Sequence, residues 1–157
     1  MKATIRTALL LGLLVAGSLR AADAPPALQQ IRALWNDMQH AANAHDINRF
    51  MVPFVRSPDL VFAVNGEIIR GWDALHAQQL KWWNHGKSDA RYMQAGKLEI
   101  IALGPDAEVS TASFTSRRTR PDGKISTGRF VVTYIWKKLP QGWRIIYGHE
   151  SWARPPR

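Results

Sequence analysis

The sequence predicts an α+β fold in which N-terminal helices pack on an antiparallel sheet. Near the start of the mature chain, apolar residues recur at three- and four-residue steps, as they do in an amphipathic helix. The second half instead contains long strand-like segments, separated by Gly104-Pro105-Asp106, Pro121-Asp122-Gly123 and Pro140-Gln141-Gly142. Helices followed by a run of turn-linked strands are typical of α+β proteins with an antiparallel meander.

The first residues have the layout of a secretory signal peptide. Lys2 and Arg6 precede an apolar stretch over residues 8–16, and small residues follow it. This stretch is shorter than the ~20 apolar residues that span a bilayer. We assign residues 1–24 to a signal peptide, with the cleavage position left open, and residues 25–157 to one domain. We expect a periplasmic or secreted protein with no membrane anchor after cleavage.

Composition restricts the chemistry of this domain. The chain has no cysteine, which excludes disulfides, thiolate catalysis and cysteine-containing zinc sites. Its formal net charge is +9, and removal of residues 1–24 leaves +7. A basic cluster over residues 117–129 either attracts anions or keeps an exposed hairpin soluble. Because export is expected, we expect no nucleic-acid partner.

The helices are placed by their periodicity and their ends. A first helix is expected over residues 25–44, where the apolar residues form one stripe. A second, short helix begins after Asp46, a typical N-cap residue, and ends before Pro53. Helical spacing of apolar residues predicts a third helix over residues 72–83.

The strands are placed by alternation and by turn residues. Asn65-Gly66 lies between two short apolar segments, and these residue types adopt the positive φ angles of a type I′ turn. We therefore expect a hairpin of residues 60–64 with residues 67–70. Longer strands are expected at about residues 91–103, 107–118, 126–138 and 142–152.

This order of elements resembles the NTF2-like superfamily, specifically its SnoaL-like (DUF4440-type) branch. Local sequences agree over nearly the whole mature chain, including His45-Asp46, Gly71-Trp72-Asp73-Ala74-Leu75, Gly142-Trp143-Arg144-Ile145-Ile146 and His149-Glu150-Ser151. The resemblance implies a cone-shaped half-barrel with helices packed on a strongly bent sheet. It also implies a pocket at the wide end and a homodimer formed through the sheet.

The last strand carries the candidate catalytic residue. Strand alternation places Trp143, Ile145, Tyr147, His149 and Ser151 on one face. The resemblance implies that the His-x-Ser positions face the pocket, so His149 would transfer protons while Tyr147 and Ser151 bind the ligand. Histidine suits this role because its unperturbed pKa lies near neutral pH. Alternatively, His149 is a half-buried strand residue with no chemical role.

The other candidate ligand-binding residues are Trp35, Trp82, Arg129 and Thr133. Arg129 and Thr133 share a strand face, and the resemblance places that face toward the pocket, where a guanidinium could hold a carboxylate. A solvent-facing Arg129 is the alternative. Trp82 is expected at the pocket mouth or in the core.

These residues predict an exported domain that binds a small, largely apolar organic molecule. We expect acid–base catalysis of the isomerase, dehydratase or cyclase type, although no glutamate matches the base of ketosteroid isomerase. The alternatives are a non-catalytic periplasmic carrier and a dimeric association module that uses Phe130, Tyr134 and Trp136. The histidines form no metal-binding motif, so we expect no metal and no cofactor.

Overall fold

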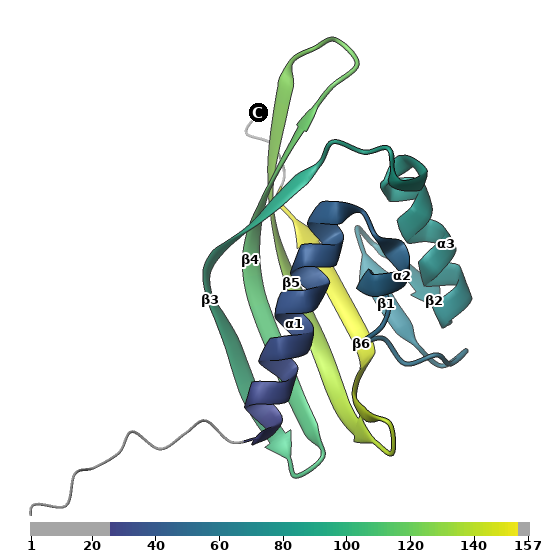
Figure 1. The fold of residues 1–157 in the computed structure, drawn as a ribbon, viewed down its shortest axis with the longest axis vertical. Helices are drawn as coiled ribbons and strands as arrows, with labels where there is room; N and C mark the ends of the chain where they lie inside the picture. Colours follow the sequence, from purple (N-terminus) through teal and green to yellow (C-terminus); the bar gives the residue numbers. More distant parts are fainter. Residues whose placement is uncertain (1–25, 154–157) are drawn as a thin grey trace, which may run out of the picture.

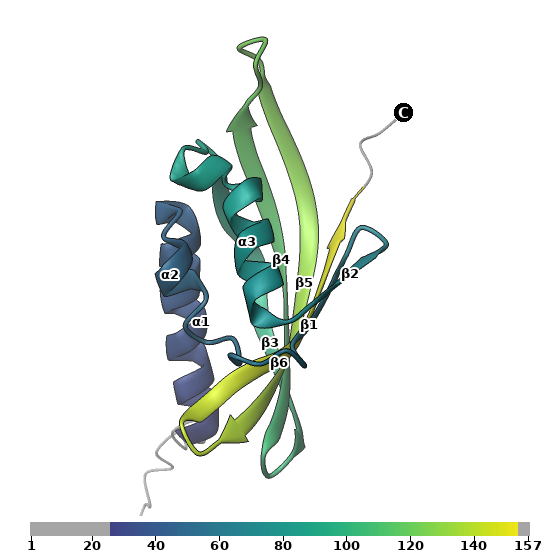
Figure 2. The ribbon, with the colours of Figure 1, turned by 90° about the vertical axis from the view of Figure 1, so that its right-hand side faces the viewer.

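The computed structural model describes residues 26–153, which form helices packed on one face of a curved, unclosed sheet (Figures 1 and 2). The helices are α1 (Pro26–Ala44), α2 (Ile47–Phe50) and α3 (Trp72–Trp82), and a 3₁₀ turn, η1 (Asn84–Gly86), follows α3. The predicted α+β class is confirmed. The predicted signal peptide lies outside the described residues and stays a prediction.

The sheet has six strands in the order β2-β1-β6-β5-β4-β3. Their bounds are β1 (Val61–Val64), β2 (Glu67–Arg70), β3 (Arg91–Gly104), β4 (Ala107–Thr119), β5 (Ile125–Leu139) and β6 (Gly142–Trp152). The four long strands form the predicted antiparallel meander. The short hairpin of β1 and β2 joins it through a parallel pairing of β1 with β6, which was not predicted from the sequence.

The core lies between α1 and the sheet face that the helices cover, here called the inner face (Figure 2). Ile31, Trp35 and Met38 are buried on the apolar stripe of α1. Burial of such side chains stabilises the fold by about 1.5–3 kcal/mol each. Asp46 caps α2 as predicted, because its side chain accepts a hydrogen bond from the Arg49 backbone N–H. No helix among residues 26–153 is long and apolar enough to cross a membrane.

A β-bulge in β6 changes which side chains face the helices. Ile145 pairs with Trp136 and Tyr147 pairs with Ile135, so Ile146 is an extra residue in β6. Ile145 before the bulge is buried, whereas His149 after it is exposed. The expectation that one face of β6 continues from Trp143 to Ser151 is therefore wrong.

Gly148 allows two aromatic rings to pack directly over β6. A Cβ atom at this position would lie 2.5 Å from Cδ2 of Phe62 and 3.1 Å from Cε1 of Tyr134. We expect Gly148→Ala to lower the free energy of unfolding by about 1–3 kcal/mol, because overpacking forces buried side chains to shift. Urea denaturation measures the change. The control is Gly104→Ala, since nothing lies within 4 Å of a Cβ there, and an equal loss in both variants would contradict the packing argument.

Candidate functional site

Five predicted site residues lie on the sheet face that points away from the helices, here called the outer face. They are Arg129, Thr133, Tyr147, His149 and Ser151. Thr133 pairs with His149 across β5 and β6, and its Oγ1 lies 3.0 Å from Oγ1 of Thr111 on β4. Arg129, His149 and Ser151 are exposed. The structure thus brings these residues to one face, but that face is the one opposite the helices.

The reason for this placement differs between the two strands. In β6, the bulge at Ile146 moves His149 to the outer face. In β5, Phe130, Tyr134 and Trp136 are buried on the inner face, so the alternate positions point outward. The inward orientation that the resemblance implied is therefore wrong for this group, while the catalytic and ligand-binding roles of its members stay predictions.

A shallow cavity of about 380 Å³ opens beside two of these residues. Arg129 and Ser151 line it together with Ala95, Ser113 and Val131. The rest of the lining comes from Phe114, Phe130, Trp152 and Ala153. Ala95, Ser113, Val131 and Ser151 form a continuous cross-strand row from β3 to β6. The small side chains of three of them leave room for the cavity beside this row.

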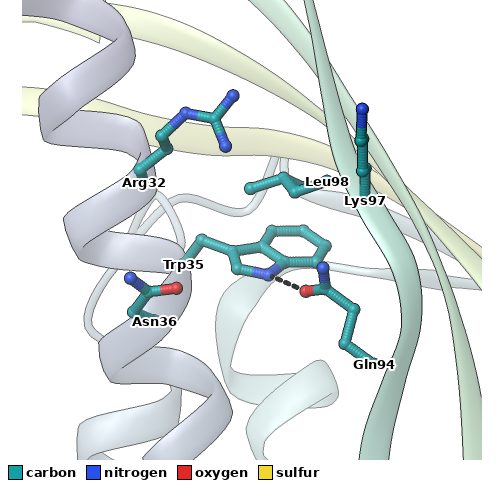
Figure 3. Close-up of a pocket in the computed structure, with 6 residues that line it drawn as sticks. All are labelled: Arg32, Trp35, Asn36, Gln94, Lys97 and Leu98. Carbon is teal, nitrogen blue, oxygen red and sulfur yellow. Dashed lines mark hydrogen bonds between the residues drawn. The ribbon is translucent and has the colours of Figure 1, made fainter.

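Trp35 and Trp82 lie away from the outer-face group. Trp35 is buried between α1 and the sheet, and its indole Nε1 donates a hydrogen bond of 2.9 Å to Oε1 of Gln94 (Figure 3). Trp82 on α3 is 40% exposed, and its ring centroid lies 6.4 Å from that of Phe62 on β1. The sequence-predicted residues therefore fall into separate places rather than one pocket.

The inner face carries an acidic group that was not among the residues predicted from the sequence. Glu150 on β6 follows the bulge, so its half-buried side chain shares a face with Gly148 and Trp152. Trp152 Nε1 donates a hydrogen bond of 2.6 Å to Oε1 of Glu150. Burial raises the pKa of Glu150, and the Trp152 hydrogen bond opposes this effect. Glu150 is thus a carboxyl group whose protonation changes closer to neutral pH than usual.

Two tyrosines respond to the charge of Glu150. Burial raises the pKa of Tyr134, and the nearby Glu150 charge raises it further. Burial also raises the pKa of Tyr92; a hydrogen bond from Trp83 lowers it, and the Glu150 charge raises it again. Both phenols therefore stay protonated at neutral pH and can donate hydrogen bonds. We call Glu150, Trp152, Tyr92 and Tyr134 the Glu150 cluster.

Tyr92 is held firmly at the sheet edge. The Asn43 side chain on α1 donates to the Tyr92 carbonyl at 2.9 Å and accepts from the Tyr92 N–H at 2.8 Å. The Tyr92 hydroxyl accepts a hydrogen bond of 3.1 Å from Trp83 Nε1. These bonds hold Tyr92 at its backbone and at its hydroxyl. The phenol is therefore fixed in orientation, as a binding or catalytic group needs to be.

A histidine lies close to this cluster. The ring centroid of His45 is 5.5 Å from that of Trp83, and within residues 26–153 its buried Nε2 has no hydrogen-bond partner. Burial lowers the pKa of His45, and the Arg91 charge lowers it further, so the ring is neutral at pH 7. In the same part of the chain, no three His, Asp or Glu residues gather as metal ligands would.

The Glu150 cluster left one signal in the sequence. Ile145 and Ile146 are consecutive apolar residues in an otherwise alternating strand, and such a pair can mark a bulge. A shift of one position after this pair puts Glu150, and not His149, toward the core. If the side chains of β6 are assigned to the two faces by strict alternation, without the bulge, the residues after Ile146 are placed on the wrong face.

Solved structures share this fold. An NTF2-like superfamily protein from Salmonella enterica is 22% identical with a TM-score of 0.69, and the match covers 82% of this chain and 92% of that one. A ketosteroid isomerase-like protein from Erwinia carotovora is 18% identical with a TM-score of 0.68, covering 84% and 100%. An NTF2-like protein from Shewanella oneidensis is 23% identical with a TM-score of 0.67, covering 79% and 98%. At these identities the likeness shows the fold alone.

The sequence itself matches a family over most of its length. No curated protein matches the chain. The AtzH-like family matches residues 20–155, a range that contains every described residue. Together with the solved structures, this match confirms the predicted NTF2-like superfamily, while the SnoaL-like branch stays a prediction. The chain therefore belongs to the AtzH-like family of NTF2-like proteins.

Proposed function

We propose that this protein binds a small organic molecule at the inner face of the sheet and catalyses proton transfer there. Glu150 is the general base, and Tyr92 and Tyr134 are hydrogen-bond donors to the oxygen that gains negative charge. The observation that carries the proposal is the half-buried Glu150 carboxyl, whose pKa burial raises, beside two protonated phenols. The reaction class is isomerisation or dehydration next to a carbonyl group.

This chemistry requires a base and an acid in different protonation states. A carboxylate whose pKa is raised is a stronger base than an exposed one. Neutral phenols can stabilise an enolate oxygen without first losing a proton. Environments that separate the protonation states of neighbouring groups are typical of enzymes that move protons.

The surroundings suit an apolar substrate. Phe130 stacks on Trp152 with ring centroids 4.4 Å apart, and Tyr92 meets Phe130 edge-on at 6.1 Å. These rings make the inner face apolar near Glu150, and Trp152, with 37% of its surface exposed, offers apolar surface to a small molecule. The ketosteroid isomerase-like protein from Erwinia carotovora shares the fold, and its name supports the reaction class proposed for this chain.

Proton exchange in D₂O tests the proposal across several classes of substrate at once. The purified protein is incubated with a panel of carbon acids, namely 3-ketosteroids, cyclic ketones and β-hydroxy ketones. Mass spectrometry then follows deuterium uptake and loss of water. We expect catalysed exchange for at least one class. A folded protein that accelerates none of them would count against proton transfer and favour a non-catalytic carrier.

The outer face favours a second role, which is association with another copy of the chain. Met93, Ile101 and Val131 are exposed on β3 and β5, with 68%, 61% and 41% of their surface accessible. The helices leave this face uncovered within residues 26–153 (Figure 2). Exposed apolar surface on a sheet favours association. We therefore propose a homodimer formed through the outer face.

A charge placed on the outer face should prevent this pairing. We expect Val131→Lys to convert the dimer to a monomer, because a buried unpaired charge opposes association. Light scattering coupled to size exclusion measures the mass. The matched control is Val52→Lys, which changes a residue that is 56% exposed and lies after α2. A monomeric wild-type protein would exclude the dimer.

A further inference from the structure

A second cavity lies between α1 and β3. It has a volume of about 300 Å³. Six residues line it, Arg32, Trp35 and Asn36 from α1 and Gln94, Lys97 and Leu98 from β3 (Figure 3). This volume is at the small end of the range for ligand sites, ~300–1,000 Å³, which suits a molecule with one ring.

An irregularity in β3 forms one wall of this cavity. Ala95 pairs with Ser113 and Glu99 pairs with Thr111, so three residues of β3 stand opposite one residue of β4. Gly96 begins this bulge with a φ angle of 99°. Bulges change the direction of side chains and are common beside binding sites. Here the bulge brings Lys97 and Leu98 to face α1.

The base of the cavity is apolar, and its polar atoms are already bonded. Trp35 and Leu98 are buried. The Trp35 indole N–H is bound by Gln94, and the Gln94 amide in turn donates to the Gly96 carbonyl at 3.0 Å. Trp35 has 1% and Leu98 9% of its surface exposed. An apolar group can therefore rest on this floor without leaving a buried donor unpaired.

The rim of the cavity is cationic. In Figure 3 the charged ends of Arg32 and Lys97 lie on the same side of the Trp35 ring, while Asn36 and Gln94 lie on the other. None of the six lining residues is acidic. The ion pairs of residues 26–153 join Arg49 to Asp37 and Arg120 to Asp122, so neither Arg32 nor Lys97 is neutralised in this way. An anion can bind between two such cations without displacing a carboxylate.

We propose that this cavity binds a small aromatic carboxylate. Its ring lies in the cavity against the floor that Trp35 and Leu98 form, and its carboxylate lies between Arg32 and Lys97. This site does not rest on the proposed function, because binding needs neither Glu150 nor turnover. It can therefore hold an effector or an acidic substrate that is distinct from the carbon acids tested above.

Sodium benzoate is the probe, and nuclear magnetic resonance of the indole N–H groups is the readout. We expect saturable binding with a Kd of about 1 mM or tighter. The Trp35 indole signal should shift on titration, whereas that of Trp143, buried elsewhere in the core, should stay in place. Benzamide, which has the same shape but no charge, should bind at least about 10-fold more weakly, since charge-assisted bonds are about twice as strong as neutral ones.

The double variant R32Q/K97Q should weaken benzoate binding at least about 10-fold, because both cations that hold the carboxylate are lost. The matched control is R70Q/K81Q, which removes the same charge from exposed positions on β2 and α3. All four positions are exposed, so both proteins should unfold at the wild-type temperature. Absence of saturable benzoate binding to the wild type would overturn the proposal, as would equal weakening in the control.

Discussion

Glu150→Gln is expected to reduce catalysed proton exchange about 100- to 10,000-fold, the range that general-base catalysis contributes. Glutamine keeps the size of the side chain and can still accept the Trp152 hydrogen bond. It cannot take up a proton. The substrate should bind with nearly unchanged affinity, so the loss should appear in kcat and only weakly in KM. Deuterium exchange with the best carbon acid of the panel measures it.

His149→Gln is the control, because His149 is the neighbouring residue on the same strand and lies on the outer face. We expect this variant to retain most of the exchange activity. Full activity in Glu150→Gln together with loss of activity in His149→Gln would contradict the assignment of the base. That result would support the role for His149 predicted from the sequence.

The pH dependence of the same variant separates catalysis from stability. Burial raises the pKa of Glu150 in the folded protein. The folded state therefore binds the Glu150 proton more tightly than the unfolded state does. The protonated carboxyl contributes to the free energy of unfolding at low pH, and this contribution is lost as pH rises through the raised pKa. At neutral pH, Glu150→Gln should be at least as stable as the wild type. The proton exchange that the wild-type protein catalyses should increase as pH rises through the raised pKa of Glu150.

Trp136→Ala is expected to lower the free energy of unfolding by about 3–5 kcal/mol. Trp136 has 0% of its surface exposed and lies on β5 in the middle of the sheet. Its Nε1 donates a hydrogen bond of 2.8 Å to Oγ of Ser110, which is also fully buried. The substitution leaves a large cavity and removes the partner of a buried hydroxyl. Urea denaturation measures this loss, and we expect the m-value to stay unchanged.

Trp82→Ala is the matched comparison. The same atoms are removed, but Trp82 is 40% exposed and lies at the end of α3. Trp82→Ala should lower the free energy of unfolding much less than Trp136→Ala does, because less buried apolar surface is lost and no closed cavity forms. Similar losses at both positions would mean that burial does not determine the contribution of these indoles.

Local patterns were enough to predict the secondary structure of this chain. The apolar stripe of α1, the Asp46 cap and the Asn65-Gly66 turn each depend on residues close in sequence, and each is present. The long meander was also predictable, because its strands follow one another through short turns. These features follow from backbone geometry, which neighbouring residues determine.

The placement of the site was decided by tertiary structure. The parallel pairing of β1 with β6 joins residues that are more than 80 positions apart, and no local pattern specifies it. The bulge at Ile146 reverses the orientation of every later side chain, so Glu150 lies on the inner face and His149 on the outer face. The physical reason is that strand side chains alternate with a period of two, and a single inserted residue exchanges the two faces. The sequence by itself determined the elements and their order, whereas the pairing of β6 with its bulge determined which side of β6 faces the helices and so placed Gly148 against Phe62 and Tyr134.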